Sequence, residues 1–283
     1  MTVSSALREA EGRLRSAGVS DPALDAELLL RHVLGWDRAT LVARASEELP
    51  PAEAVRFRAA VDERARRRPL QHIVGTQAFW RQTFLVSPDV LVPRPETEVL
   101  VEQALERLGG RTAPVIVDVG TGSGCIALSL AAERPDAEVL ATDLSPAALA
   151  VAAENARRLG LQTRVAFHAG DLLEPLAGRR GRVDLVVSNP PYVDPAELAA
   201  LSPEVRDHEP RAALVAADPP YGIYERLAAQ SAAILGPGGW LVVEVGQGMA
   251  EGVAERFRAA GLEVSGITRD LAGIPRAVTA RRH

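Results

Sequence analysis

One segment constrains the fold of this chain more than any other. Val115–Val119 is a short apolar run typical of a buried strand, and it leads directly into Gly120-Thr121-Gly122-Ser123-Gly124. A helical pattern of apolar residues begins at Ile126. Glycine allows the sharp turn and the close backbone approach that a strand-to-helix connection needs. The segment therefore predicts a strand–loop–helix unit of an α/β domain.

The same alternation continues to the C-terminus. The expected strands are 115–119, 138–142, 164–169, 183–188, 240–245, 263–268 and 277–280. Helical patterns separate most of them, including 224–234 and 249–260. Strands that alternate with helices predict a doubly wound, mainly parallel α/β sheet of seven strands with helices on both faces.

The residues before this region show a different pattern of apolar positions. Helical spacing predicts helices at 3–16, 22–34, 38–45 and 52–67, and Asp21-Pro22 supplies an N-cap followed by a first-turn proline. Short alternating stretches at 83–86 and 90–92, separated by Ser87-Pro88-Asp89, predict a hairpin. We therefore expect a helical domain at 1–72, a hairpin linker at 73–93 and an α/β domain at 94–283.

Composition excludes several classes of protein. The 283 residues carry 32 basic side chains, all of them arginine, against 37 acidic ones, and the net charge of −5 disfavours a broad nucleic-acid surface. A single cysteine excludes a disulfide framework or a cysteine-rich zinc site, and the five histidines lack metal-ligand spacing, so we expect no metal site. Without a signal segment or a long apolar run, we expect a cytoplasmic protein that does not contact membranes.

The glycine loop predicts an adenosine-containing ligand once Asp143 is considered. Asp143 ends the second strand, 19 residues after Gly124, where a carboxylate can accept hydrogen bonds from both ribose hydroxyls. Such a residue serves NAD and S-adenosylmethionine equally. Asp171 ends the third strand and is placed to accept from an adenine amino group, with Leu172 against the ring; alternatively, Asp171 caps the following segment.

Asn189-Pro190-Pro191-Tyr192 follows the fourth strand and indicates the type of reaction. The prolines hold the Asn189 side-chain oxygen and the Pro190 carbonyl in a preset arrangement, and Tyr192 can stack on a planar group. An amide or nucleobase nitrogen is a poor nucleophile. Two acceptors for its hydrogens favour a lone pair directed at an electrophilic methyl group and stabilise positive charge on nitrogen. We therefore take Asn189, Pro190 and Tyr192 as catalytic and Asn189–Tyr192 as substrate-binding, with Asn189 also near the cofactor.

Other residues have less specific interpretations. Asp218-Pro219-Pro220-Tyr221 is a rival tetrapeptide, but it follows a short alanine-rich run and is better explained as a turn before a helix. His208, Glu209 and Arg211 either contact substrate or form a structural ion pair. We interpret Cys125 as a packing residue and Glu244 as part of the architecture.

These residues resemble the HemK/PrmC-type protein-(glutamine-N5) methyltransferases of peptide chain release factors. The resemblance spans nearly the whole chain. It is carried by Pro69–Gly75, by Val90–Glu98 with its Pro93-Arg94-Pro95-Glu96-Thr97-Glu98 run, by the glycine loop, by Asn189–Tyr192 and by His208–Arg211.

The resemblance implies a class I methyltransferase-like, Rossmann-like fold. It also implies methyl transfer from S-adenosylmethionine, giving S-adenosylhomocysteine, to the glutamine of a Gly-Gly-Gln motif, which modulates translation termination. The helical domain would help to grip the release factor, and we expect a monomer. By position, the glycine loop would line the methionine end of the cofactor, Asp143 would hold its ribose, and Asn189, Pro190 and Tyr192 would hold the glutamine. Leu172 stands where the family often has a larger aromatic residue, and the stretch 217–222 departs from its glycine-rich pattern.

Two other functions compete with this one. A nucleobase amino-methyltransferase would need a basic, aromatic-bearing surface, whereas this chain is acidic and 4% aromatic. A dinucleotide-dependent oxidoreductase or a non-catalytic adenosine-binding module would use the same loop and carboxylate.

Overall fold

The computed structural model describes residues 1–216 and 220–283, which form two compact units. Unit 1 comprises Met1–Thr76 with Leu201–His208, and unit 2 comprises Gln77–Ala200 with Glu209–His283. Asp218 and Pro219 of the rival tetrapeptide, and the start of the 217–222 stretch, lie outside the described residues. No helix within the described ranges is long and apolar enough to cross a membrane.

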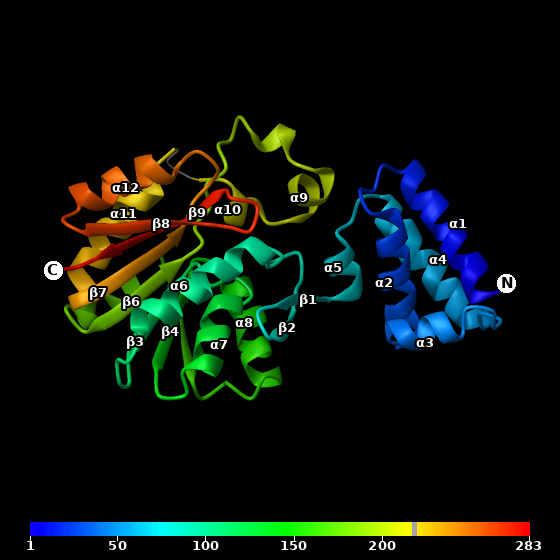
Figure 1. Cartoon of the computed structure of the whole chain (residues 1–283), viewed down its shortest axis with the longest axis horizontal. Coiled ribbons are helices and arrows are strands. Elements are labelled where there is room, and N and C mark those ends of the chain that lie inside the picture. Colours follow the sequence, from blue (N-terminus) through cyan, green and yellow to red (C-terminus); the bar gives the residue numbers. More distant parts are fainter. Residues whose placement is uncertain (217–219) are drawn as a thin grey trace. The chain divides into compact units, whose positions relative to one another are not determined.

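Unit 1 is a small helical bundle (Figure 1). Its helices are α1 Val3–Ser16, α2 Pro22–Leu34, α3 Arg38–Ala43, α4 Pro51–Ala65 and α5 Leu70–Val74, joined by α9 Pro203–His208 from later in the chain. The buried residues of α1 recur at helical spacing, and they pack with residues of α2 and α4 around Phe57. Asp21 stands at the N-cap of α2, but its side chain makes no capping hydrogen bond.

A buried arginine joins α9 to the rest of unit 1. The Arg64 side chain is 8% exposed; its Nε donates to Asp25 at 2.6 Å and its Nη1 to Glu204 of α9 at 2.8 Å. Arg67 also donates to Glu204, at 2.7 Å from Nε and from Nη2. These donors hold the pKa of the Glu204 carboxyl at about 2, against the opposing effect of its burial. Charge pairing thus attaches a short segment with no buried apolar residue to this unit.

Unit 2 contains a seven-stranded sheet in the order β5-β4-β3-β6-β7-β9-β8. Its strands are β3 Val115–Val119, β4 Glu138–Asp143, β5 Val165–Ala169, β6 Val183–Ser188, β7 Leu235–Glu244, β8 Glu263–Arg269 and β9 Pro275–Arg281. The first five run parallel, and β9 is antiparallel to both β7 and β8. The predicted α/β fold with a mainly parallel sheet is confirmed.

Helices cover both faces of this sheet (Figure 1). One face packs against α6 Glu98–Leu108, α7 Cys125–Glu133 and α8 Pro146–Arg158, and the other against α11 Gly222–Ile234 and α12 Ala250–Ala259. Shorter elements are the 3₁₀ helices η1 Pro95–Thr97, η2 Glu174–Arg179 and η3 Leu198–Ala200, and α10 Arg211–Leu214.

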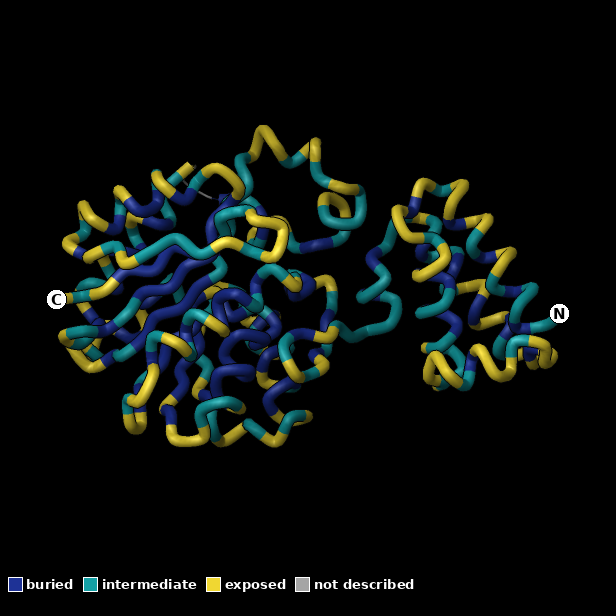
Figure 2. The backbone as a smooth tube through the Cα atoms, viewed as in Figure 1, coloured by how far each residue is buried: buried dark blue, intermediate teal, exposed yellow. Residues whose placement is uncertain are grey.

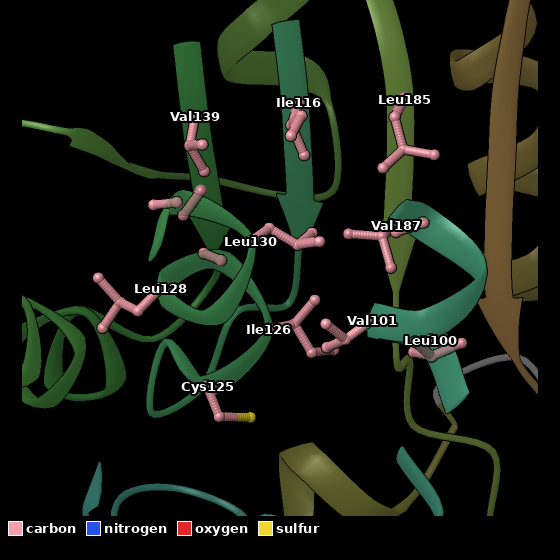
Figure 3. Packing of buried hydrophobic residues seen from close by; sticks show 14 of the residues in the cluster. Leu100, Val101, Ile116, Cys125, Ile126, Leu128, Leu130, Val139, Leu185 and Val187 are labelled. Carbon is pink, nitrogen blue, oxygen red and sulfur yellow. The ribbon is translucent and has the colours of Figure 1, made fainter. Parts of the chain in front are cut away.

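The central strands are buried on both sides, as Figure 2 shows by their dark colour. Ile116 belongs to the cluster with α6 and α7, and its neighbour Val117 belongs to the cluster with α11 and α12. Ile126 of α7 and Val187 of β6 lie within the first cluster (Figure 3). Continuous apolar runs are what a sheet covered on both faces requires.

The predicted hairpin is partly wrong. Its strands are β1 Thr76–Phe79 and β2 Gln82–Leu85, so the turn lies at Trp80, which has φ 55°, and not at Ser87-Pro88-Asp89. Residues 90–92 form no strand. Val90 is apolar because it packs with Val86 and with Ala148 of α8. Burial against a helix and strand pairing produce the same short apolar signal.

Candidate active site

A cavity of about 430 Å³ lies in unit 2, where β3, β4 and β6 end. β3 stands between β4 and β6, at the point where the strand order reverses and where ligands of such sheets bind. Most of the site residues predicted from the sequence line this cavity: Gly120, Thr121, Gly122, Ser123, Asp143, Asp171, Leu172, Asn189, Pro190 and Pro191. Of the predicted residues, Gly124 and Tyr192 lie outside its described lining.

Backbone hydrogen bonds join the glycine loop to the end of β4. The amides of Gly120 and Thr121 donate to the Thr142 carbonyl at 2.9 and 3.0 Å. The Gly122 amide donates to Oδ2 of Asp143 at 2.8 Å. The loop is therefore held at the cavity wall, with its backbone open to a ligand.

Gly124 joins the glycine loop to α7. It is the N-cap of α7 with φ 82°, and its amide donates to the Thr121 carbonyl at 2.8 Å. A Cβ atom at this position would meet Leu128 Cδ1 at 3.0 Å and Ala152 Cβ at 3.2 Å. Both the backbone conformation and the close packing of α8 therefore require glycine.

Replacing Gly124 with alanine should destabilise the protein by roughly 2–4 kcal/mol, because left-handed strain and overpacking add. Gly122→Ala is a matched control: Gly122 also has positive φ, 56°, but no atom lies within 4 Å of an added Cβ. Its cost should be only about 1–2 kcal/mol. Urea denaturation measures both values, and equal losses would show that packing against Ala152 does not matter.

Asp143 is oriented by two backbone amides. Its Oδ2 accepts from Gly122 at 2.8 Å and its Oδ1 from Ser145 at 2.9 Å. A carboxylate oxygen has two lone-pair directions, so each oxygen can accept a second hydrogen bond. Leu144, which follows Asp143, is 70% exposed although it lines the cavity. Asp143 and Leu144 together therefore offer hydrogen-bond acceptors beside an apolar surface.

Asp118 lies beneath the loop and was not predicted as a site residue. Its Oδ2 accepts from the Thr121 hydroxyl at 2.7 Å and from the Ala127 amide at 3.1 Å. Desolvation raises the pKa of this fully buried carboxyl to about 7, and the charge of Asp143 acts in the same direction. Asp118 thus connects the loop to the first turn of α7.

This raised pKa predicts how stability depends on pH. Because the folded-state pKa lies above the unfolded one, Asp118 stabilises the fold below about pH 4 and loses this contribution as the pH rises to about 7. In Asp118→Asn, this component of the pH dependence should vanish. The unfolding free energies of the two proteins should diverge by up to about 1.4 kcal/mol per pH unit in that window. Parallel curves between pH 4 and 7 would contradict the assignment.

Asp171 and Leu172 line the cavity after β5. The Asp171 side chain is 38% exposed and forms an ion pair with Arg226 of α11 through Oδ2. Leu172 has φ 48°, a conformation that non-glycine residues seldom adopt. The Leu173 amide donates to the Gln230 side chain of α11 at 2.8 Å, which helps to hold this turn.

The Asn189-Pro190-Pro191 segment is positioned from the end of β6. The Ser188 hydroxyl donates to the Val119 carbonyl at 2.8 Å, which fixes the ends of β6 and β3 together. The Asn189 Nδ2 donates to the hydroxyl of Thr97 at 3.2 Å. Pro190 is buried, whereas Asn189 and Pro191 are partly exposed to the cavity.

The Tyr192 ring packs against the core cluster under α11 and α12. A Cβ on Gly246 would come within 3.0 Å of its Cδ2, so the ring lies directly against the backbone after β7. Burial, with the charge of Glu244, raises the pKa of Tyr192 to about 12. The hydroxyl therefore keeps its proton at neutral pH. Tyr192 is the last residue of the motif and lies outside the described lining of the cavity.

Arg94 and Glu209 form an ion pair in which one nitrogen, Nη2 of Arg94, lies 2.7 Å from both carboxylate oxygens. The Glu209 side chain is 1% exposed, whereas Arg94 is 30% exposed and lines the cavity. Of the two interpretations left open for the Glu209 region, the ion pair is therefore present, but its partner is Arg94 rather than a neighbour in sequence. Arg94 thereby stays fixed at the cavity wall.

Two further predictions concern Cys125 and metals. Burial raises the pKa of the Cys125 thiol to about 12, with the charge of Asp118 adding to the effect, so the thiol stays protonated. Among residues 1–216 and 220–283, no group of three or more His, Cys, Asp or Glu side chains could hold a metal ion.

Several residues of the site were missed because no local pattern identifies them. Thr97 reaches Asn189 from 92 positions away, and Glu244 ends β7 as a buried carboxyl in an apolar run. Arg94 and Thr97 belong to the 93–98 run, whose role the sequence did not explain. A charged residue at the carboxyl end of a central strand is the signal that could have identified Glu244.

Comparisons with known proteins show which proteins this chain is similar to. The chain matches the PrmC N-terminal domain over residues 5–75 and the methyltransferase small domain over residues 95–202. It is 46% identical to a release factor glutamine methyltransferase of Cereibacter sphaeroides over 99% of both chains. It is 48% identical to one of Moorella thermoacetica over 92% of this chain and 91% of the relative. A methyltransferase structure from Pyrococcus furiosus shares the fold, with a TM-score of 0.51 and 18% identity over 70% of this chain and 88% of that one.

Proposed function

This chain belongs to the family of release factor glutamine methyltransferases, and we propose that it transfers a methyl group from S-adenosylmethionine to a release factor. The acceptor is the side-chain amide nitrogen (N5) of the glutamine in the Gly-Gly-Gln motif. The observation that carries the proposal is a single cavity lined by the glycine loop, by Asp143 and by Asn189-Pro190.

The residues of the cavity fit the proposed cofactor. The Asp143 carboxylate is held by two amides and keeps acceptor capacity for two ribose hydroxyls. Leu144, Leu172 and Ile223 provide apolar walls for an adenine ring, and Asp171 can accept from the adenine amino group. The loop amides and the positive N-terminal end of α7 would hold the end of the cofactor that bears the carboxylate.

When bound, S-adenosylmethionine supplies an electrophilic methyl group, and S-adenosylhomocysteine is the product. The chain supplies position and electrostatics. The Asn189 Oδ1 and the Pro190 carbonyl accept the two hydrogens of the glutamine amide, and Pro191 and Tyr192 hold these acceptors in place. Two oxygens directed at the nitrogen stabilise the positive charge that grows there. Fixing the nitrogen near the methyl group contributes on the order of 7 kcal/mol or more.

The helical unit 1 is proposed to contribute to binding of the protein substrate. The match of residues 5–75 to the PrmC N-terminal domain supports this role. The net charge of −5 with no lysine favours a protein over a nucleic acid as the direct partner.

Methyl transfer to a purified release factor tests the function. With radiolabelled S-adenosylmethionine, label should enter the release factor and be absent from its variant in which the Gly-Gly-Gln glutamine is alanine. Label in both proteins would show that another residue is the acceptor. Label in neither, with a wild-type relative active on the same substrate, would overturn the proposal.

A further inference from the structure

We propose that Thr97 and Glu244 are positioning residues that determine which end of the Asn189 side-chain amide faces the substrate. The inference rests on the function proposed above and deepens it. Thr97 ends η1 and Glu244 ends β7, and their exposed fractions are 3% and 1%. Neither residue needs to contact the reacting atoms to act in this way.

The hydrogen-bond chain has a definite polarity. Asn189 Nδ2 donates to Thr97 Oγ1 at 3.2 Å. The Thr97 hydroxyl acts as a donor toward the Glu244 carboxyl and lowers its pKa, against the larger effect of burial. A hydroxyl has one hydrogen, and an ionised carboxylate only accepts. Thr97 must therefore donate to Glu244, and only its lone pairs remain for Asn189. This arrangement selects the amide orientation in which nitrogen faces Thr97 and Oδ1 is left to accept from the substrate.

The opposite polarity would be unproductive. If the Glu244 carboxyl were protonated, it could donate to Thr97, and the Thr97 hydrogen would then point at Asn189. The Asn189 amide would turn its oxygen toward Thr97 and present its NH₂ group to the NH₂ group of the glutamine. Two donors would then face each other, and the acceptor on which the reaction depends would be lost.

The groups around Glu244 place the change between these two hydrogen-bond polarities near neutral pH. Burial raises the pKa of its carboxyl to about 7. The charged and titratable groups around it come from five elements or loops: Arg94 and Glu96, Tyr192, Arg276, Tyr224 and Cys125. Arg94 and Arg276 favour the charged form, whereas Glu96 opposes it. Activity should therefore rise as the pH increases through about 7.

A purely architectural role does not explain this carboxyl. Its Oε2 is buried and has no hydrogen-bond partner among the described residues, which is unusual for a group that only stabilises a fold. The contact that does look architectural is made by the main chain: the Tyr224 hydroxyl donates to the Glu244 carbonyl at 3.3 Å. That bond would survive replacement of the Glu244 side chain.

The first test removes the Thr97 hydroxyl. Thr97→Val should lower kcat for release factor methylation roughly 10- to 100-fold while S-adenosylhomocysteine affinity changes little, and Thr97→Ser should restore most of the rate. Thr279→Val is a matched control, because Thr279 is fully buried on β9 and its hydroxyl has no partner in the described structure. It should leave kcat unchanged. Full activity of Thr97→Val, or equal losses in the valine and serine variants, would overturn the inference.

The second test is a pH profile, which tests the inference even if Thr97→Val does not fold. In the wild type, kcat should fall below about pH 7. In Glu244→Gln, this acidic limb should disappear, because the glutamine amide does not titrate. An acidic limb that persists in Glu244→Gln would overturn the inference while leaving the methyltransferase function intact. The function itself fails only if the wild type transfers no methyl group at any pH.

Discussion

Asn189→Ala should lower kcat for methylation of the release factor by roughly 10²- to 10³-fold, the range seen when one preorganised polar contact to a transition state is removed. The alanine side chain cannot accept a hydrogen from the glutamine amide, so charge that develops on nitrogen loses one of its two oxygen partners. The loss should appear in kcat more than in KM, because this interaction strengthens as the charge develops.

The structure indicates what this variant should leave unchanged. The only side-chain hydrogen bond described for Asn189 goes to Thr97, and Asn189 itself is partly exposed. The variant should therefore fold with an unfolding midpoint close to that of the wild type. Calorimetry with S-adenosylhomocysteine should give a dissociation constant within about threefold of the wild-type value, since less than 1 kcal/mol is at stake. Turnover that survives in Asn189→Ala would remove this residue from the mechanism.

The sequence predicted the elements whose signal is local. α1, α2 and β6 begin and end where the periodicity and the flanking residues indicate. β7 begins earlier than predicted, at Leu235, because Leu235 pairs with Val183 of β6, and residues 236–239 lie in the register shift between this pair and the pair Leu185–Trp240. Local patterns thus identified the strands and underestimated pairing that tertiary packing imposes.

The residues of the candidate site also fall into two groups: those with a local sequence signal and those brought together by tertiary packing. Residues at the ends of consecutive strands were predicted to lie together, and Asp143 and Asn189 do line one cavity, because parallel strands end at a common edge. Thr97 could not be found in this way, and Glu244, which does end a parallel strand, was interpreted as part of the architecture. They approach Asn189 only because η1 precedes a helix that packs on the sheet and because β7 lies next to β6. Such contacts depend on the order of strands in the sheet, which the sequence does not state.

The carboxylate at the end of β4 should dominate cofactor affinity. Asp143→Ala is expected to weaken S-adenosylhomocysteine binding by roughly 10- to 100-fold, because hydrogen bonds to a charged group contribute about 1.5–3 kcal/mol. The variant also loses the acceptors for the amides of Gly122 and Ser145, so the glycine loop would be held less firmly. Titration calorimetry measures the change directly.

Asp171→Ala is the matched control, since it removes the same chemical group from the same cavity. Asp171 is 38% exposed and already paired with Arg226, so its hydrogen bond to an adenine amino group is screened by water and by the guanidinium. Its loss should weaken binding only about threefold. If Asp171→Ala lost as much affinity as Asp143→Ala, the adenine contact rather than the ribose contact would dominate recognition. If Asp143→Ala bound normally, Asp143 would serve only to fix the loop.

NAD, whose ribose could use the same carboxylate, should give no binding heat with the wild type, because the glycines at every second position suit its pyrophosphate poorly.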